Sequence, residues 1–308
     1  LLDFKVEFDC WFSEKSLFEE KKVEEVLELL NKKKIVYEKD GATWMKSSLF
    51  GDDKDRVLIK ENGAHTYFAS DIAYHRDKFS RNFDLVIDIW GADHHGYVPR
   101  MEAMIEALSY SKDFFKVILV QLVSLRRGNE KLSMSTRSGK FVALSDVLNE
   151  VGCDAARYFF LMRGSNSHLD FDLELAKKQS PENPVYYVQY AHARICSVVR
   201  EAKATGVDAF VIENVDLSLL DLPEELNIIK SLSQFPEVVL KSANSLETHL
   251  IPFYLQELAY LFHSYYNKYR IISNDIKLTH ARLAMTTGVK IVLKNALELL
   301  GINAPERM

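Results

Sequence analysis

The stretch KLSMSTRSGK (131–140), with GCDAARYFFLMRGSNSHLDFD (152–172) after it, separates two kinds of pattern in this chain of 308 residues. Before it, apolar runs typical of strands alternate with helical spacing, as they do in an α/β domain. After it, the spacing of apolar residues is helical only. The sequence therefore predicts an α/β domain over residues 1–172 and an all-α bundle over residues 173–308.

The loop at 131–140 is rich in hydroxyl groups and cations. Its hydrogen-bond donors and charges are Lys131, Ser133, Ser135, Thr136, Arg137, Ser138 and Lys140. Groups of this kind, held over a phosphate, can stabilise the negative charge that develops during attack at phosphorus. The alternative, which composition alone favours, is a solvated surface loop.

A strand, a loop and a helix follow one another in DLVIDIWGADHHGYVPRMEAMIEAL (84–108). The strand is expected to be apolar throughout, as in a buried parallel strand. Its loop carries Gly91, Asp93, His94 and His95 at the carboxyl end of the strand, where α/β sheets bind nucleotides. Alternatively, Asp93 caps the next helix and the histidines are ordinary loop residues. KVILVQLVSL (116–125) predicts another buried strand.

TYFASDIAYHRDKF (66–79) is predicted to pass from strand to helix. In one interpretation Ser70 caps that helix, and Asp71 lies in its first turn, facing the helix dipole. In the other, Asp71 and Tyr67 bind a guanidinium, since a carboxylate pairs with it in a bidentate manner and a tyrosine ring can stack on it. Upstream, the spacing predicts a helix over Lys15–Lys34 and antiparallel hairpins over 35–47 and 55–68.

The bundle is predicted to begin at Ser180-Pro181, an N-cap followed by proline. A core stripe is expected at Val188, Ala191, Ile195, Val198 and Ala202. Beside it, Tyr187, Tyr190 and Arg194 share one face, either as half-buried rings with solvated hydroxyls or as a surface for unstacked bases. Further helices are expected over about 223–247, 249–270 and 276–300.

The composition is that of an ordinary soluble protein, with 47% hydrophobic and 27% charged residues. No stretch is long and apolar enough to span a membrane, and no secretory signal is visible. The cysteines at 10, 153 and 196 form no C-x-x-C pair, which favours a reducing, cytoplasmic location. Residues 173–308 contain 14 Lys and Arg against 15 Asp and Glu, so RNA binding there would need local patches.

Four motifs taken together, SMSTRSG (133–139), DAAR (154–157), HLDFD (168–172) and NPVYYVQYAHAR (183–194), resemble those of bacterial arginyl-tRNA synthetases. The resemblance covers nearly the whole chain. It implies part of a class I Rossmann-type nucleotide-binding domain with inserted β-hairpins, followed by a helical anticodon-binding domain that DAAR identifies. It also implies ATP-dependent attachment of arginine to its tRNA. HLDFD, which is expected to be an acidic turn, then has a structural role; the alternative is that His168, Asp170 and Asp172 bind a metal.

The resemblance assigns roles residue by residue. It implies signature-loop residues Lys131, Ser133, Met134, Ser135, Thr136 and Arg137; arginine-binding Tyr67 and Asp71; ATP-binding Gly91, Asp93, His94 and His95; and tRNA-binding Tyr187, Tyr190, Arg194 and Met308. ATP with Mg²⁺ is the implied co-substrate, with no tightly bound metal or organic cofactor. The implied partners are the arginine-specific tRNA, arginine and ATP, and the intact enzyme is expected to be a monomer in the cytoplasm.

The sequence departs from the family pattern in two ways. The earlier His-Ile-Gly-His signature of class I synthetases is not found, so we expect a C-terminal portion that is not competent alone. In the loop, Ser133 and Thr136 stand where lysines are expected, which leaves open whether Lys131 or Arg137 supplies the charge. The alternatives are a non-catalytic tRNA-binding module derived from a synthetase, and a cysteinyl-type synthetase, whose zinc-binding cysteines are not seen.

Overall fold

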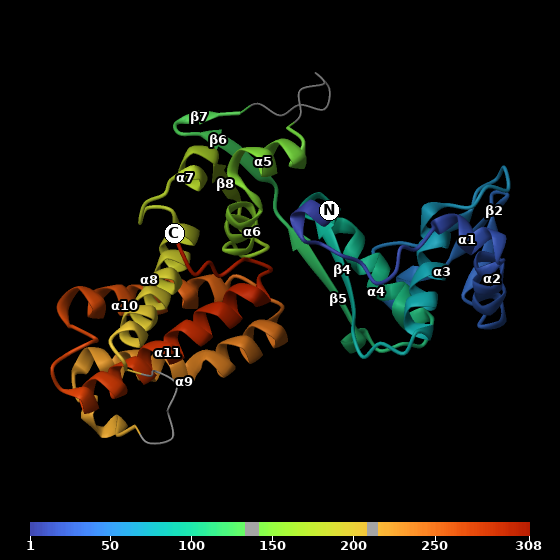
Figure 1. Ribbon diagram of the computed structural model, residues 1–308. Helices are drawn as coiled ribbons and strands as arrows, with labels where there is room; N and C mark the ends of the chain where they lie inside the picture. Colours follow the sequence, from blue (N-terminus) through green and yellow to red (C-terminus); the bar gives the residue numbers. More distant parts are fainter. Residues whose placement is uncertain (133–141, 208–214) are drawn as a thin grey trace. The chain divides into compact units, whose positions relative to one another are not determined.

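The computed structural model describes residues 1–132, 142–207 and 215–308, and its contacts divide the chain into two compact units (Figure 1). One is Phe8–Leu122, here called the mixed unit. The other combines Leu1–Glu7 with Val123–Met308 and is here called the bundle unit. These units are defined by contacts, whereas the boundary at 172/173 concerns functional domains and stays a prediction.

The mixed unit begins with two short helices, α1 (Glu14–Glu19) and α2 (Lys22–Lys32). The single helix expected over Lys15–Lys34 is therefore wrong. Lys21 lies between the two with φ of 58°, a left-handed conformation that interrupts the helix. The predicted apolar spacing is confirmed in α2, where Val23, Val26 and Leu30 are buried.

The predicted hairpins form one antiparallel sheet of three strands, β1 (Val36–Lys39), β2 (Ala42–Met45) and β3 (Arg56–Ile59). The turn between β1 and β2 is confirmed, with Asp40 and Gly41 both at positive φ. The second hairpin is only partly formed. After β3 the chain turns back and pairs through the Ile59–His65 bridge and through hydrogen bonds from Lys60 N to Ala64 O and from Thr66 N to Leu58 O, both 2.9 Å, but residues 60–66 form no strand. A short helical turn, η2 (Ser47–Phe50), lies between β2 and β3.

Two parallel strands, β4 (Val86–Gly91) and β5 (Phe115–Val120), pair in register from Val86↔Phe115 to Gly91↔Val120. The other elements near them are α3 (Tyr67–Ser80), η3 (Ala92–Tyr97), α4 (Val98–Ala107) and η4 (Lys112–Phe114). The expectation of an apolar, fully buried β4 is wrong. Val86 and Asp88 are buried on one face, while Ile87 and Ile89 are exposed on the other.

The bundle unit contains a small sheet of order β7-β6-β8, made of β6 (Val123–Arg127), β7 (Glu130–Lys131) and β8 (Leu169–Asp172). Two expectations are corrected here. The strand predicted over 116–125 is two strands, β5 and β6, which belong to different sheets. HLDFD is strand β8, parallel to β6, and not a turn. Asp172 caps α7 (Leu173–Lys177) by accepting hydrogen bonds from the N–H groups of Glu174 and Leu175.

The other described helices of this unit are η1 (Leu2–Phe4), α5 (Leu144–Val151), α6 (Cys153–Leu161), α8 (Pro184–Ala204), η7 (Leu217–Leu219), α9 (Pro223–Ser245), α10 (Leu250–Lys268) and α11 (Ile276–Leu299). The last three confirm the predicted ranges to within about two residues. The predicted start at Ser180-Pro181 is wrong: α8 begins at Pro184, and the Asn183 side chain accepts from the N–H of Val185 at 3.2 Å.

Helices α8 to α11, yellow to red in Figure 1, surround an apolar core. The predicted stripe of α8 is confirmed, since Val188, Ala191, Ile195, Val198 and Ala202 are all buried. Within the described ranges, no helix is both long and apolar enough to cross a lipid bilayer.

Candidate functional site

A cavity of about 470 Å³ opens in the mixed unit where α3, β4 and η3 meet. Its lining residues are Tyr67, Asp71, Tyr74, His75, Lys78, Asp88, Trp90, His94, Tyr97 and Met101. Tyr67 and Asp71 are four residues apart on α3 and therefore lie on the same face of the helix. The structure thus brings the two predicted arginine-binding residues to one cavity.

The position of Asp71 removes the helix-cap interpretation. Helix α3 begins at Tyr67 with Thr66 as its N-cap, so Asp71 is the fifth helical residue and lies beyond the first turn. Ser70 is not the cap either, because it is buried and its hydroxyl donates to Glu14 Oε1 at 2.7 Å. Asp71 therefore does not have the alternative role that the sequence offered, that of a first-turn carboxylate facing the helix dipole.

The Asp71 carboxylate is half-buried and only partly satisfied. Its Oδ2 accepts a hydrogen bond from the Tyr97 hydroxyl at 3.4 Å, and no donor among the described residues reaches its Oδ1. Burial raises the pKa of Asp71, and the nearby charge of His75 opposes that rise. An unsatisfied carboxylate oxygen in a cavity is a suitable acceptor for a cation such as a guanidinium.

Tyrosines surround this carboxylate. Tyr67 is 83% exposed, so its ring stands free at the edge of the cavity. Tyr97 is held between the Arg100 guanidinium, 4.2 Å from the ring centroid, and Trp90 in an edge-on contact. A planar cation entering toward Asp71 would meet aromatic surface on these sides.

The loop after β4 places the predicted nucleotide-binding residues at the end of the strand. A Cβ atom at Gly91 would stand 2.6 Å from Asp93 Oδ1, a close contact that the exposed Asp93 side chain can relieve by rotating. His94 lines the cavity, whereas His95 bonds through Nδ1 to the Ala92 carbonyl at 3.3 Å. Asp93, His94 and His95 are all exposed, so ATP-binding roles for these residues stay predictions.

The predicted signature loop is described only at its start. Lys131 is exposed in β7. The other predicted residues, Ser133, Met134, Ser135, Thr136 and Arg137, lie outside the described residues.

Sequence reasoning missed a buried ionic network of Asp88, His75 and Lys78, which lines the same cavity as Asp71. Asp88 accepts from Lys78 Nζ at 2.6 Å and is bonded to His75 Nε2 at 2.8 Å. Burial raises the pKa of Asp88, but the hydrogen bonds and charges of His75 and Lys78 outweigh it and leave the pKa below its ordinary value. An aspartate inside the apolar run DLVIDIW was the available signal, because such a residue is buried only when it is paired.

A second cluster forms on α8 around His263 of α10. The Arg194 guanidinium donates to Tyr190 Oη at 3.0 Å and to His263 Nδ1 at 3.2 Å, and it stacks over the rings of Tyr190 and Tyr266. His263 Nε2 bonds to the Tyr187 carbonyl at 3.1 Å. Burial lowers the pKa of His263, as expected for a neutral ring that accepts at Nδ1 and donates from Nε2. The structure therefore brings Tyr187, Tyr190 and Arg194 together.

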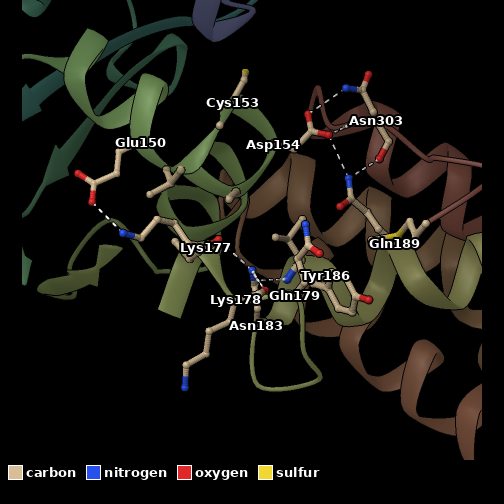
Figure 2. Close-up of a pocket in the computed structure, with 16 residues that line it drawn as sticks. Glu150, Cys153, Asp154, Lys177, Lys178, Gln179, Asn183, Tyr186, Gln189 and Asn303 are labelled. Atoms are coloured by element: carbon tan, nitrogen blue, oxygen red, sulfur yellow. Dashed lines mark hydrogen bonds and ion pairs between the residues drawn. The ribbon is translucent and has the colours of Figure 1, made fainter. Parts of the chain in front are cut away.

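Met308 lies elsewhere, at a cavity of about 590 Å³ in the bundle unit (Figure 2). Its lining includes Lys177, Lys178, Tyr186, Gln189, Asn303 and Met308, but not Tyr187, Tyr190 or Arg194. The predicted tRNA-binding residues thus occupy two places. Tyr186 connects them, because its ring stacks on Tyr190 with centroids 5.8 Å apart.

Asp154 and Arg157, the first and last residues of DAAR, bind segments of the bundle unit that are far apart in the sequence. Arg157 donates to the carbonyls of Phe4 and Leu300, both at 2.7 Å. Asp154 accepts from Gln189 Nε2 at 3.0 Å and from the main chain of Asn303 at 3.2 Å, as Figure 2 shows. This motif therefore fixes the segment that leads to Met308, a role that sequence reasoning did not find.

Among the described residues, no group of three or more His, Cys, Asp or Glu side chains is arranged to hold a metal ion.

Two family models match the chain. "tRNA synthetases class I (R), catalytic domain" covers residues 4–168, and "DALR anticodon binding domain" covers residues 188–308. The chain belongs to the class I arginyl-tRNA synthetase family. The predicted resemblance and fold class are therefore confirmed, and the cysteinyl-type alternative is set aside.

Relatives in the arginyl-tRNA synthetase family agree over the whole chain. It is 57% identical over 308 residues to the arginine–tRNA ligase of Syntrophotalea carbinolica, and 57% identical over 309 residues to that of Geobacter sp. strain M21. All of this chain is matched, but only 56% of each relative. The chain thus spans about half the length of the curated relatives it matches.

Solved structures of arginyl-tRNA synthetases show the same fold. The putative arginyl-tRNA synthetase of Campylobacter jejuni superposes with a TM-score of 0.90 at 37% identity, covering 100% of this chain and 66% of that one. The Thermus thermophilus arginyl-tRNA synthetase has a TM-score of 0.78 at 22% identity over 94% of this chain and 58% of that one, which supports the fold alone.

Proposed function

We propose that the protein is an arginine–tRNA ligase that joins arginine to ATP, releases pyrophosphate and transfers the aminoacyl group to tRNA. The observation that carries this proposal is Asp71, a half-buried carboxylate with an unsatisfied oxygen beside Tyr67, in a chain of the arginyl-tRNA synthetase family. Asp71 binds the guanidinium of arginine by paired hydrogen bonds, and Tyr67 covers its plane.

The remaining roles follow the family motifs. Gly91, Asp93, His94 and His95 take part in seating ATP, which enters with Mg²⁺ as co-substrate. Lys131 and the loop from Ser133 to Arg137 stabilise the departing pyrophosphate. The proposed catalytic domain covers residues 1–172, and the anticodon-binding domain covers residues 173–308. The proposal includes a monomeric enzyme acting in the cytoplasm.

The bundle unit is proposed to bind the anticodon loop of tRNA. The Tyr187, Tyr190 and Arg194 cluster offers half-buried aromatic rings and a guanidinium, the groups on which unstacked bases dock. Met308 contributes from the separate cavity beside Tyr186. The stacked pair Tyr186–Tyr190 makes these two places neighbours, which suits successive bases of a single strand.

The decisive experiment replaces Asp71 with Asn in the full-length gene product. Loss of the charge-assisted hydrogen bonds should cost roughly 1.5–3 kcal/mol of arginine affinity, measured by calorimetry. The matched control is Asp84→Asn, an exposed aspartate of the same unit, which should bind arginine as the unchanged protein does. Citrulline, which lacks the charge, should lose little affinity in the Asp71 variant. Unchanged arginine affinity in a folded Asp71→Asn protein would overturn the assignment.

A tRNA titration tests the bundle. Tyr190→Ala should lower affinity for the arginine-specific tRNA by roughly 1–3 kcal/mol, because a stacking platform is removed. Phe253→Ala on α10 is the aromatic control, since this exposed ring lies outside the cluster. Equal affinities for the two variants would return Tyr190 to the role of an ordinary tyrosine at the edge of a helix. Arginine-dependent pyrophosphate exchange by the full-length protein separates an enzyme from a non-catalytic tRNA-binding module.

A further inference from the structure

Two carboxylates line the cavity of the mixed unit, and they differ in how fully they are satisfied. Asp88 is 6% exposed and both of its oxygens are used, Oδ1 by Lys78 Nζ at 2.6 Å and Oδ2 by His75 Nε2 at 2.8 Å. Asp71 uses only Oδ2, through Tyr97. An incoming cation therefore meets one available carboxylate, even though two border the cavity.

His75 connects the two carboxylates. Its ring is buried, with Nε2 facing Asp88 Oδ2 and Nδ1 facing the main-chain oxygen of Asp71, each at 2.8 Å, while Lys78 Nζ lies farther from Nε2, at 3.5 Å. Both neighbours are hydrogen-bond acceptors. A neutral imidazole carries only one N–H, so it can satisfy only one of these contacts. The imidazolium satisfies both, and its charge is then opposite to that of the carboxylates on either side.

The position of the ring is well fixed. The edge of Phe115 meets it with centroids 5.6 Å apart and an interplanar angle of 83°. Lys78, which shares Asp88 with His75, lies over the Tyr74 ring at 4.4 Å. His75 and Lys78 are both on α3, and Asp88 is on β4, so the network joins the helix that carries Asp71 to the adjacent strand.

We propose that His75 is a positioning residue for the arginine site: held as an imidazolium between Asp88 and the main chain of Asp71, it keeps the Asp71 carboxylate ionised and in place for a guanidinium. This inference rests on the proposed function, in which Asp71 binds arginine. His75 borders the cavity, but its two ring nitrogens face Asp88 and the main chain of Asp71, so it acts through Asp71. Lys78 completes the neutralisation of Asp88, so that Asp88 does not compete with Asp71 for the substrate.

The charges around Asp71 decide the direction of the effect. Glu14 on α1 and Asp88 on β4 disfavour its ionised form, as burial does. His75 on the same helix favours it, and so does the hydrogen bond from Tyr97 of η3. Tyr67, Tyr74 and Lys78 of α3 and His94 of η3 also line the cavity beside it. Removing the charge of His75 therefore raises the pH needed to ionise Asp71.

The first measurement looks at His75 directly. The ring nitrogens of the full 308-residue chain, labelled with ¹⁵N in histidine, are followed by NMR, and the His75 signals are assigned by their loss in His75→Gln. We expect both nitrogens to show protonated-type shifts at pH 7.5. A neutral-tautomer pattern at that pH would overturn the proposal.

The second measurement is arginine affinity against pH in the full-length gene product. His75→Gln should lower affinity on the order of tenfold at neutral pH and move the acidic limb of the profile upward by about one pH unit, since a neighbouring positive charge is lost. Lys78→Gln is the matched control: it disturbs the same Asp88 network, so a purely structural role predicts the same profile for both variants. The proposal predicts a clearly larger upward move of the acidic limb in His75→Gln than in Lys78→Gln, because His75 acts on Asp71 directly and Lys78 acts only through Asp88.

The outcomes separate the two levels of inference. If Asp71→Asn binds arginine like the unchanged protein, the proposed function fails, whatever His75 does. If Asp71→Asn loses arginine but His75→Gln keeps both the affinity and the pH profile, only the role of His75 fails. Identical shifts of the acidic limb in His75→Gln and Lys78→Gln would also overturn it, because they would indicate general disturbance of the network.

Discussion

Asp88 in the mixed unit and Glu225 in the bundle unit are both buried carboxylates paired with cations, but they serve different ends. Asp88 borders a cavity beside a half-satisfied carboxylate. Glu225 is 0% exposed, and its Oε1 accepts from Tyr265 Oη and Arg282 Nε, both at 2.8 Å. These contacts join α9, α10 and α11.

The difference shows that burial of a charge does not by itself identify a functional site. Both carboxylates satisfy the rule that buried charges are paired. What distinguishes Asp88 is the neighbouring Asp71, which keeps an oxygen free at the surface of a cavity. The Glu225 network has its partners within the packed helices and is best understood as fixing their arrangement.

The largest expected effect concerns the network of Glu225, Tyr265 and Arg282. Arg282→Met should lower the free energy of unfolding of the bundle unit by roughly 3–5 kcal/mol, because Glu225 loses its only cationic partner among the described residues. Adding Glu225→Gln should restore much of the loss. Urea unfolding followed by helical circular dichroism measures both, with exposed Lys230→Met as the control. A loss below about 1 kcal/mol would remove the contrast with Asp88.

The network of Asp88, His75 and Lys78 should be less sensitive to the loss of a cation. Lys78→Met is expected to cost the mixed unit about 1–2 kcal/mol, since His75 remains on Asp88 and water in the cavity can replace Nζ. Tryptophan fluorescence reports this unit alone, because Trp11, Trp44 and Trp90 all lie within it. An effect as large as that of Arg282→Met would mean that both networks are mainly structural.

The two units should also lose stability in different pH ranges. Burial lowers the pKa of His192 and of His263, so the unfolded chain binds more protons and the bundle unit should lose stability as pH falls below about 6.5. The pKa of Asp88 is lowered by His75 and Lys78 against the effect of burial, so its contribution should be lost only as pH falls below about 3.9. Urea unfolding at several pH values, followed by circular dichroism and tryptophan fluorescence, measures both ranges. His263→Gln should reduce the pH dependence of the bundle unit's free energy of unfolding and leave that of the mixed unit unchanged.

The smallest effect concerns the exposed face of β4. Ile89 is 68% exposed, so Ile89→Thr should change the free energy of unfolding by less than about 0.5 kcal/mol. Ile72→Val, on the buried side of α3, should cost roughly 0.5–1.5 kcal/mol. Fluorescence-detected unfolding compares them. A larger loss from Ile89→Thr would show that this strand face is covered in solution.

Sequence patterns predicted the helical bundle well because its information is local. The spacing of Val188, Ala191 and Ile195 reports one helix face directly, and the same spacing brings Tyr67 and Asp71 together. The start of α8 was misplaced because Ser180-Pro181 and Asn183-Pro184 carry the same capping signal. Only the hydrogen bond of Asn183 decides between them.

The parts of the site that could not be predicted depend on packing between elements. The pairing of Asp88 with His75 requires that β4 and α3 meet at one register, which no spacing within either segment reveals. The exposed face of β4 was hidden because Ile87 and Ile89 are as apolar as the buried Val86. Periodicity in hydrophobicity disappears when both faces carry apolar residues.

The hydrogen bonds from Arg157 to the carbonyls of Phe4 and Leu300 have a consequence for the order of events during protein synthesis. Arg157 leaves the ribosome before Leu300, whose carbonyl it binds, by 143 residues. At synthesis rates of about 5–20 residues per second, this interval is roughly 7–30 s. During that time Phe4 and Lys5, whose carbonyls Arg157 also binds, are already synthesised, whereas Leu300 is not. Helix α6, which carries DAAR, can therefore contact Phe4 and Lys5 before α8 to α11 have been synthesised, and it can contact Leu300 only afterwards.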